Sequence, residues 1–195
     1  GPLAPAPVPR VAGDGRFTLV AFGRIRPYKG LDVLLDALAR LGPGVRERLH
    51  VIIAGEPLMD LAPLRDRIAA AGLGATVALR PWRLDDAGMA ALFARADGFV
   101  FPYREIEASG VFYLVQGLRR WIVASRLGAF AEALEDGVSA RLVPPGDPSA
   151  LADALRGCGE LRPRPLAAPR VTGWEAIARE TLAVYAAAAI GRRAG

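Results

Sequence analysis

Several residue types that commonly build reactive sites are scarce in this sequence. Among its 195 residues there is one cysteine, Cys158, and one histidine, His50. A single cysteine excludes an internal disulfide framework and any metal site made of several cysteines. A single histidine excludes zinc sites built on two or more histidines. We therefore expect no metal centre, a thiol at Cys158 that is inert because no base is near it in the sequence, and a structural or surface role for His50.

Lysine and asparagine are almost missing as well. Of the 25 basic residues only Lys29 is a lysine, and the chain contains no asparagine. Arginine, alanine, glycine and proline in their place indicate a GC-rich, bacterial coding sequence. The net charge of +5 would suit a nucleic-acid partner, but 20 acidic residues are interspersed with the arginines and no five basic residues stand in a row. We expect no nucleic-acid partner, and a basic nucleic-acid-binding domain remains as a second alternative.

Long apolar runs are also absent, although 52% of the residues are hydrophobic. No run reaches the ~18 residues of a membrane span. The N-terminus lacks the charged start and apolar stretch of a signal peptide. We expect a cytoplasmic protein, with peripheral attachment at the inner face of the membrane as an option. Residues 1–15 are rich in proline, glycine and alanine and predict a flexible linker or a tag remnant, since Gly-Pro is what a cleaved purification tag leaves.

From residue 16 onward, short apolar runs alternate with amphipathic stretches. The apolar runs predict strands over residues 17–22, 50–54, 76–79, 98–101, 121–124 and 140–143. The amphipathic stretches predict helices over residues 31–41, 60–71, 85–94, 109–118, 130–134 and 148–155. This order predicts an α/β fold with a doubly wound, Rossmann-like parallel sheet over residues 16–158. A connector is expected over residues 159–172, and a C-terminal helix and tail over residues 173–195.

The loop after the first predicted strand concentrates unusual residues. Ligands of doubly wound sheets bind beyond the carboxyl ends of the strands, where this loop lies. Its sequence is GRIRPYKG, with two glycines, two arginines and the only lysine. Glycine lets the backbone approach a ligand, the following helix offers free N–H groups, and arginine and lysine supply positive charge. The loop predicts a diphosphate site at Arg24 and Lys29, and the alternative is a solvated basic loop.

A second loop of interest follows the strand at 98–101 and reads PYREIEASGV. Glu107 precedes the predicted helix at the edge of the crevice. The backbone N–H groups of Gly110 and Val111 are expected to point into the crevice as a second anion site. For Glu107 the alternative is that its carboxylate only complements the helix dipole.

Several segments together resemble a known family. They are FGRIRPYKGLDVLLDAL, VIIAGEP, FPYREIEASGV, EDGVSARLVPPGDPSALADAL and the tail GWEAIARETLAVY. Over about residues 16–190 they resemble the C-terminal donor-binding domain of the retaining GT-B glycosyltransferases of family 4, the glycosyl transferases group 1. The Gly-Arg…Lys-Gly loop combined with Glu-Ala-Ser-Gly-Val makes the resemblance fairly specific, although each piece alone would be weak.

The resemblance implies roles for particular residues. In the family the first loop holds the diphosphate of a nucleotide sugar, which implies this role for Arg24 and Lys29. The first glutamate of a Glu-x7-Glu motif holds hydroxyls of the sugar, which implies this role for Glu107. These three are the expected catalytic residues. The other positions expected to bind the donor are Gly23, Gly55, Glu56, Arg80, Pro81, Trp82, Ser109, Gly110 and Val111.

The sequence also departs from the family pattern. Val115 stands where the second glutamate, which holds the ribose, is expected, and Gln116 is a poor substitute because one helical residue rotates a side chain by about 100°. Arg119 and Trp121 are bulky where the family has Gly-(Arg/Lys)-Pro-Val-Val, and Trp121 is expected to pack at the start of a strand. The family's N-terminal acceptor-binding domain has no counterpart in this chain.

The resemblance implies a donor-binding half of a retaining hexosyltransferase, which would use an NDP-sugar such as a UDP- or GDP-sugar. No metal or other cofactor is expected. Turnover by this chain alone is not expected, because the acceptor side is missing. The first alternative is a degenerate or regulatory nucleotide-sugar-binding module without activity of its own, suggested by Val115.

Overall fold

The computed structural model describes residues 14–105, 109–116, 118, 120–138 and 140–158. The strands are β1 (Phe17–Phe22), β2 (Leu49–Ala54), β3 (Val77–Arg80), β4 (Gly98–Phe101), β5 (Trp121–Ser125) and β6 (Ala140–Val143). The α-helices are α1 (Leu31–Ala39), α2 (Pro43–Arg46), α3 (Ala62–Ala70), α4 (Asp86–Arg95), α5 (Gly110–Gln116), α6 (Gly128–Ala133) and α7 (Pro148–Cys158). A 3-10 turn, η1 (Pro27–Lys29), precedes α1.

All the strand pairs are parallel, in the order β3-β2-β1-β4-β5-β6. The chain therefore builds outward from β1 in one direction and then from β4 in the other, so the strand order reverses between these two neighbours. β1 pairs with β2 along its whole length, whereas its register with β4 joins only Leu19 and Val20 to Gly98 and Phe99. In sheets of this kind the crevice beyond such a reversal is the usual ligand site.

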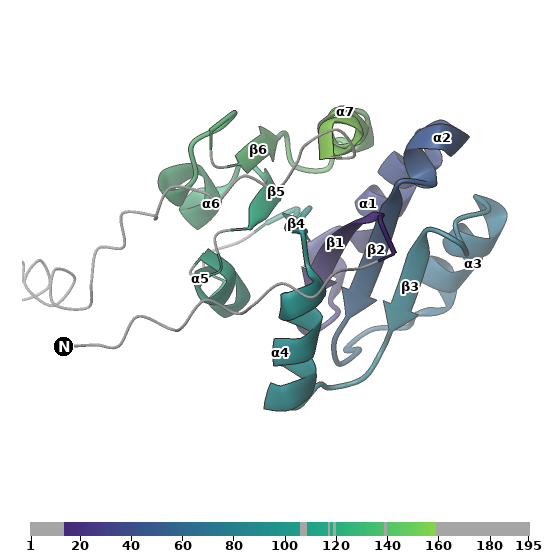
Figure 1. Cartoon of the computed structure of the whole chain (residues 1–195), viewed down its shortest axis with the longest axis horizontal. Helices are drawn as coiled ribbons and strands as arrows, with labels where there is room; N and C mark the ends of the chain where they lie inside the picture. Colours follow the sequence, from purple (N-terminus) through teal and green to yellow (C-terminus); the bar gives the residue numbers. More distant parts are fainter. Residues whose placement is uncertain (1–13, 106–108, 117, 119, 139, 159–195) are drawn as a thin grey trace, which may run out of the picture.

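Helices cover both faces of the sheet and bury a separate apolar cluster on each. One cluster joins strand side chains to α1, α3 and α7, and the other joins them to α4, α5 and α6. In Figure 1, α4, α5 and α6 lie to the left of the sheet and α3 to the right. Strands that are covered on both sides need apolar side chains in both directions, which explains why their sequences are continuous apolar runs.

Two helix starts follow directly from local sequence. The Asp85 carboxylate accepts a hydrogen bond from the Gly88 backbone N–H at 2.7 Å and so caps α4. The Asp147 carboxylate accepts hydrogen bonds from the N–H groups of Ser149 and Ala150 at the start of α7. Each carboxylate satisfies backbone donors that have no partner within the first turn.

The predicted fold class is confirmed, with small differences in the elements. The helix expected over 60–71 is Ala62–Ala70, and α7 continues to Cys158 rather than ending at residue 155. The single turns η1 and α2 were not predicted, because three or four residues are too few for a helical period to be seen. The segments 1–13 and 159–195, with the predicted connector and terminal helix, lie outside the described residues. Among the described helices, none has the length and apolar character that crossing a bilayer requires.

Candidate functional site

The loops at the carboxyl ends of β1, β2 and β4 meet at the reversal point through glycines. A Cβ on Gly30 would lie 2.0 Å from the Pro102 carbonyl oxygen. A Cβ on Gly55 would lie 2.1 Å from the Gly23 carbonyl oxygen. Both glycines also have positive φ angles, 62° and 147°, which other residues rarely adopt. The three loops therefore touch backbone to backbone, which only glycine permits.

The loop after β1 is held by Ile25 and exposes an arginine on either side of it. Ile25 is 1% exposed, its N–H donates to the Glu56 carbonyl at 2.8 Å, and it forms an isolated bridge with Pro57. Because the side chain of Ile25 points into the core, those of Arg24 and Arg26 are exposed. Among the residues that the structure describes, neither guanidinium has a hydrogen-bond or ion-pair partner. Within the described part of the chain, the loop therefore offers two cations that have no ionic partner.

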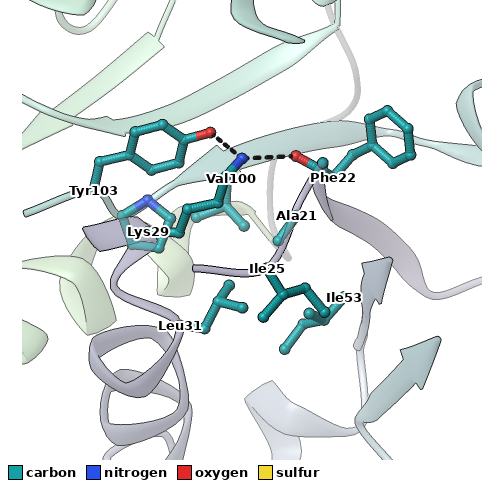
Figure 2. A pocket seen from close by; sticks show the side chains of 10 residues that line it. Ala21, Phe22, Ile25, Lys29, Leu31, Ile53, Val100 and Tyr103 are labelled. Atoms are coloured by element: carbon teal, nitrogen blue, oxygen red, sulfur yellow. Dashed lines mark hydrogen bonds between the residues drawn. The ribbon is translucent and has the colours of Figure 1, made fainter. Parts of the chain in front are cut away.

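Lys29 lies in a different environment from the two arginines. Its side chain is only 7% exposed, and its ammonium donates to the Tyr103 hydroxyl at 2.7 Å, with a longer contact of 3.4 Å to the Phe22 carbonyl (Figure 2). Burial lowers the pKa of Lys29 from 10.5 to about 8. The absence of a side chain at Gly23 leaves room for the ammonium, because a Cβ there would lie 2.9 Å from Nζ.

A small pocket underlies the Lys29 side chain. β1 and β4 stop pairing after Val20 and Phe99, so their ends leave space between them. The residues that line it are Ala21, Phe22, Gly23, Ile25, Lys29, Leu31, Ile53, Val100, Pro102 and Tyr103. Figure 2 shows the aliphatic stem of Lys29 running across this apolar surface to the two oxygens. The stem is thus packed on apolar groups, and the buried ammonium meets the two oxygens.

The loop after β4 contributes Tyr103, which is 3% exposed. Its ring makes edge contacts with the rings of Tyr28 and Phe130 and with that of Phe101. Burial raises the pKa of Tyr103 to about 12, while a hydrogen bond with the Ser109 side chain acts in the opposite direction. The hydroxyl is therefore protonated at neutral pH and lies between Lys29 and Ser109.

The residues expected around the start of α5 are placed in part. Ser109 is buried, and its hydroxyl accepts a hydrogen bond from the Phe112 N–H at 3.3 Å. Gly110 is exposed, and Val111 is close enough to the first loop that its Cγ2 would lie 3.0 Å from a Cβ on Gly23. Glu107 lies outside the described residues, so its predicted role stays a prediction.

The expected donor-binding residues that follow β2 and β3 lie on the β2–β3 side of the crevice. The Gly55 N–H donates to the Arg80 carbonyl at 3.1 Å, which joins the loops after β2 and β3. Arg80 and Pro81 are half-buried, and Glu56 is exposed. Trp82 is 52% exposed, so a large part of its ring is open to solvent. An exposed aromatic ring at this edge is suited to stacking on a base.

Other residues singled out in the sequence lie away from the crevice. Val115 is fully buried in the cluster under α4, α5 and α6, so it occupies a core position. Trp121 begins β5 and packs on the opposite cluster, as predicted. Cys158 is fully buried, and this burial raises the pKa of its thiol to about 12, which agrees with an inert thiol. His50 is half-buried near the amino end of β2, and the crevice lies at the opposite, carboxyl ends of the strands.

Sequence reasoning missed the links that join the first loop to the loop after β4. The Arg104 N–H donates to the Tyr28 carbonyl at 2.8 Å, and the Arg104 guanidinium pairs with Asp32 at 2.5 Å. Tyr103 was not singled out either, because nothing in the local pattern distinguishes a site tyrosine from a core one. The described residues contain no group of three or more histidine, cysteine, aspartate or glutamate side chains placed to hold a metal ion.

A doubly wound sheet with cationic loops at its reversal point defines a class of α/β domain that holds anionic ligands. Comparison with known proteins gives the family: residues 16–159 match the family model "Glycosyl transferases group 1". The chain belongs to this family of glycosyltransferases, as the resemblance in its sequence indicated.

Individual relatives agree with the family. The chain is 37% identical over 192 residues to a phosphatidyl-myo-inositol mannosyltransferase of Mycobacterium leprae, covering 91% of this chain and 49% of the relative. It is 33% identical over 183 residues to a D-inositol 3-phosphate glycosyltransferase of Geodermatophilus obscurus, covering 88% of this chain and 40% of the relative. The chain thus spans half or less of the length of these two relatives.

A solved structure shares the fold and adds a ligand. The Anabaena protein Alr3699/HepE, solved in complex with UDP, is 26% identical, with a TM-score of 0.65 over 75% of this chain and 40% of that chain. The same protein has been solved with UDP-glucose, at a TM-score of 0.64. The GT-B assignment of the fold is confirmed.

Proposed function

We propose that this chain is the half of a retaining hexosyltransferase that binds the nucleotide-sugar donor. The observation that carries the proposal is the crevice at the β1–β4 reversal, where the exposed Arg24 and the ammonium of Lys29 lie on one loop. Two phosphate groups need this density of positive charge. The UDP and UDP-glucose complexes of the Anabaena neighbour support a nucleotide sugar as the ligand.

The proposed chemistry is electrostatic. In transfer of a hexose with retention, the bond between the anomeric carbon and the diphosphate breaks, and negative charge develops on the departing diphosphate. Arg24 and Lys29 would stabilise this charge, and Glu107 would hold hydroxyls of the sugar. We propose that no metal or other cofactor is needed, because Arg24 and Lys29 would neutralise the phosphates in place of a divalent ion. Donor binding should then be unchanged by a chelator.

The acceptor side would come from another domain. Since the chain spans half or less of the length of two relatives, we propose that it binds the donor without transferring the sugar until an acceptor-binding domain is joined to it. A cytoplasmic location, with or without contact to the inner membrane face, belongs to the same proposal.

The test of donor binding is calorimetric titration of the 195-residue chain with UDP, GDP, ADP and their hexose derivatives. One nucleotide should bind, and its nucleoside should bind more weakly. Lys29→Ala should weaken diphosphate binding about ten- to hundredfold, the usual worth of a charged hydrogen bond, and leave nucleoside binding unchanged. Arg67→Ala is the control. Arg67 lies in the last turn of α3, away from these loops, and its guanidinium forms an ion pair with Asp36.

Equal losses for the diphosphate and the nucleoside would contradict the placement of Lys29 on the phosphates. A folded chain that binds none of these nucleotides would overturn donor binding altogether. A chain that binds the donor but remains inactive after an acceptor domain has been joined to it would favour the degenerate module. The burial of Val115 is consistent with that alternative, because no carboxylate stands there to hold a ribose.

A further inference from the structure

The buried ammonium of Lys29 depends on one well-placed acceptor. The Tyr103 hydroxyl accepts its hydrogen bond at 2.7 Å, whereas the Phe22 carbonyl lies at 3.4 Å, near the limit for a hydrogen bond. An ammonium taken out of water needs partners of this kind, or it loses its proton. Figure 2 shows Nζ lying between these two oxygens.

Among the described residues, no carboxylate performs this task instead. The described residues that line the pocket include no acid, and Tyr103 is the only other titratable side chain among them. The charged groups on neighbouring elements are Arg24 and Arg26, which are exposed, and Arg104, which pairs with Asp32 from α1. Glu105 in the loop after β4 is exposed. Within the described part of the chain, the Tyr103 hydroxyl is thus the strongest stabilising contact that the ammonium has.

The position of the hydroxyl does not depend on Lys29. The Tyr103 ring makes edge contacts with the rings of Tyr28, Phe101 and Phe130, at centroid distances of 5.4–5.8 Å. Its hydroxyl also has a hydrogen bond with Ser109, whose own hydroxyl caps the N–H of Phe112. The acceptor is therefore fixed by the core and by the start of α5, and the flexible lysine adapts to it.

We propose that Tyr103 is a positioning residue whose hydroxyl keeps Lys29 protonated and directs its ammonium toward Gly23 and Val111. This rests on the proposed function in that the aimed ammonium is the one that meets the diphosphate. The tyrosine touches the lysine and not the reacting atoms. Its removal should therefore change how phosphate binding depends on pH, rather than lower binding equally at every pH.

The composition of the chain provides a direct test without any nucleotide. Lys29 is its only lysine, so lysine labelled with ¹³C at Cε gives a single side-chain resonance whose shift reports the ionisation of that one amine. Burial already lowers the pKa of Lys29 to about 8. Tyr103→Phe keeps the ring and removes the hydroxyl, so the titration midpoint should move to lower pH. Tyr113→Phe removes an exposed hydroxyl on α5 and should leave the midpoint unchanged.

The second measurement is the dissociation constant of UDP, or of whichever diphosphate binds, at pH 6.5 and pH 9. If the midpoint falls by one pH unit, the protonated fraction well above it falls about tenfold. Tyr103→Phe should therefore weaken diphosphate binding clearly more at pH 9 than at pH 6.5, and nucleoside binding at neither pH. The amide spectrum of each variant establishes that the fold is kept.

An unchanged lysine midpoint in a folded Tyr103→Phe variant would overturn the proposal, whatever the nucleotide does. A loss of affinity that is equal at both pH values would also overturn it, since that is what a merely structural role predicts. If the midpoint moves but no nucleotide binds, the coupling of the two residues stands and the proposed donor site fails. The two ideas are therefore tested separately.

Discussion

At the scale of single residues, burial of the Lys29 charge lowers the stability of the folded state. Burial favours its neutral form, and the pKa falls from 10.5 to about 8. Below pH 8 both the folded and the unfolded chain carry the proton, so the folded state bears the full penalty of the buried charge. Between pH 8 and 10.5 the folded chain releases the proton that the unfolded chain keeps, so this residue's contribution to stability rises with pH. Binding of a diphosphate should change in the opposite direction.

Because the charge of Lys29 lowers stability but supports diphosphate binding, Lys29→Met should change the two in opposite directions. The variant keeps an unbranched stem and lacks the charge, so at pH 7 we expect it to be more stable than the original chain by about 1–3 kcal/mol. The gain should disappear toward pH 10.5, while diphosphate binding should be weak at every pH because the charge is absent throughout. Urea unfolding at several pH values measures both curves, and the buried thiol of Cys158 cancels in their difference. A variant that is less stable at pH 7 would contradict this account.

At the scale of elements, the loops after β1 and β4 form one connected unit. Gly30 touches Pro102, Tyr28 accepts from Arg104, Lys29 donates to Tyr103, and the Arg104 guanidinium pairs with Asp32 in the first turn of α1. The first three links join Tyr28, Lys29 and Gly30 to Arg104, Tyr103 and Pro102, one after another along the two segments. The surface ion pair contributes little by itself, so the close backbone approach at Gly30 matters most. The spacing between the two loops therefore depends on the absence of a side chain.

Gly30→Ala tests whether the spacing of the two loops depends on the absence of a side chain at residue 30. The new Cβ would meet a backbone oxygen at 2.0 Å in a left-handed conformation, and we expect a loss of about 2–4 kcal/mol of unfolding free energy together with weaker diphosphate binding. Gly44→Ala is the matched control. Gly44 lies in α2 with nothing within 4 Å of a Cβ, so alanine should be neutral or stabilise by up to about 1 kcal/mol. Denaturant unfolding of both variants gives the comparison, and similar losses would refute the role of the contact.

The sequence predicted the elements well and the side-chain partners poorly. Continuous apolar runs such as Phe17–Phe22 predicted buried parallel strands, because a strand covered on both faces has no polar side. The rule that ligands bind beyond the carboxyl ends of strands then selected the loop with Arg24 and Lys29. The partner of Lys29 could not be found in this way, because Tyr103 lies 74 residues further on and meets it only through the pairing of β1 with β4. The burial of Val115 likewise depends on how α5 packs.

At the scale of the molecule, the sheet contributes side chains to two apolar clusters, one on each face. In β1, β2, β4 and β5, neighbouring apolar residues point alternately into the cluster under α1, α3 and α7 and into the cluster under α4, α5 and α6. Leu19 and Val20 in β1 are such a pair, and both are fully buried. Loss of either cluster would expose one face of the same strands, so the described domain should unfold as a unit.

We therefore expect a single unfolding transition in urea, with the same midpoint by circular dichroism and by tryptophan fluorescence. A bound nucleotide should move both signals together, by about 2.7 kcal/mol when its concentration is a hundred times the dissociation constant. Two separate transitions, or a nucleotide that moves only one signal, would contradict cooperative unfolding across the sheet.

The short pairing between β1 and β4 has a mechanical consequence. Only Leu19 and Val20 of β1 are paired with β4. The pairing that joins β3-β2-β1 to β4-β5-β6 is therefore the shortest in the sheet, and it lies directly beneath the crevice. A diphosphate held by the loop after β1 and by the start of α5 would span this pairing. Such a ligand would hold β1 and β4 together. Without it, we expect the first local unfolding of the domain to separate these two strands.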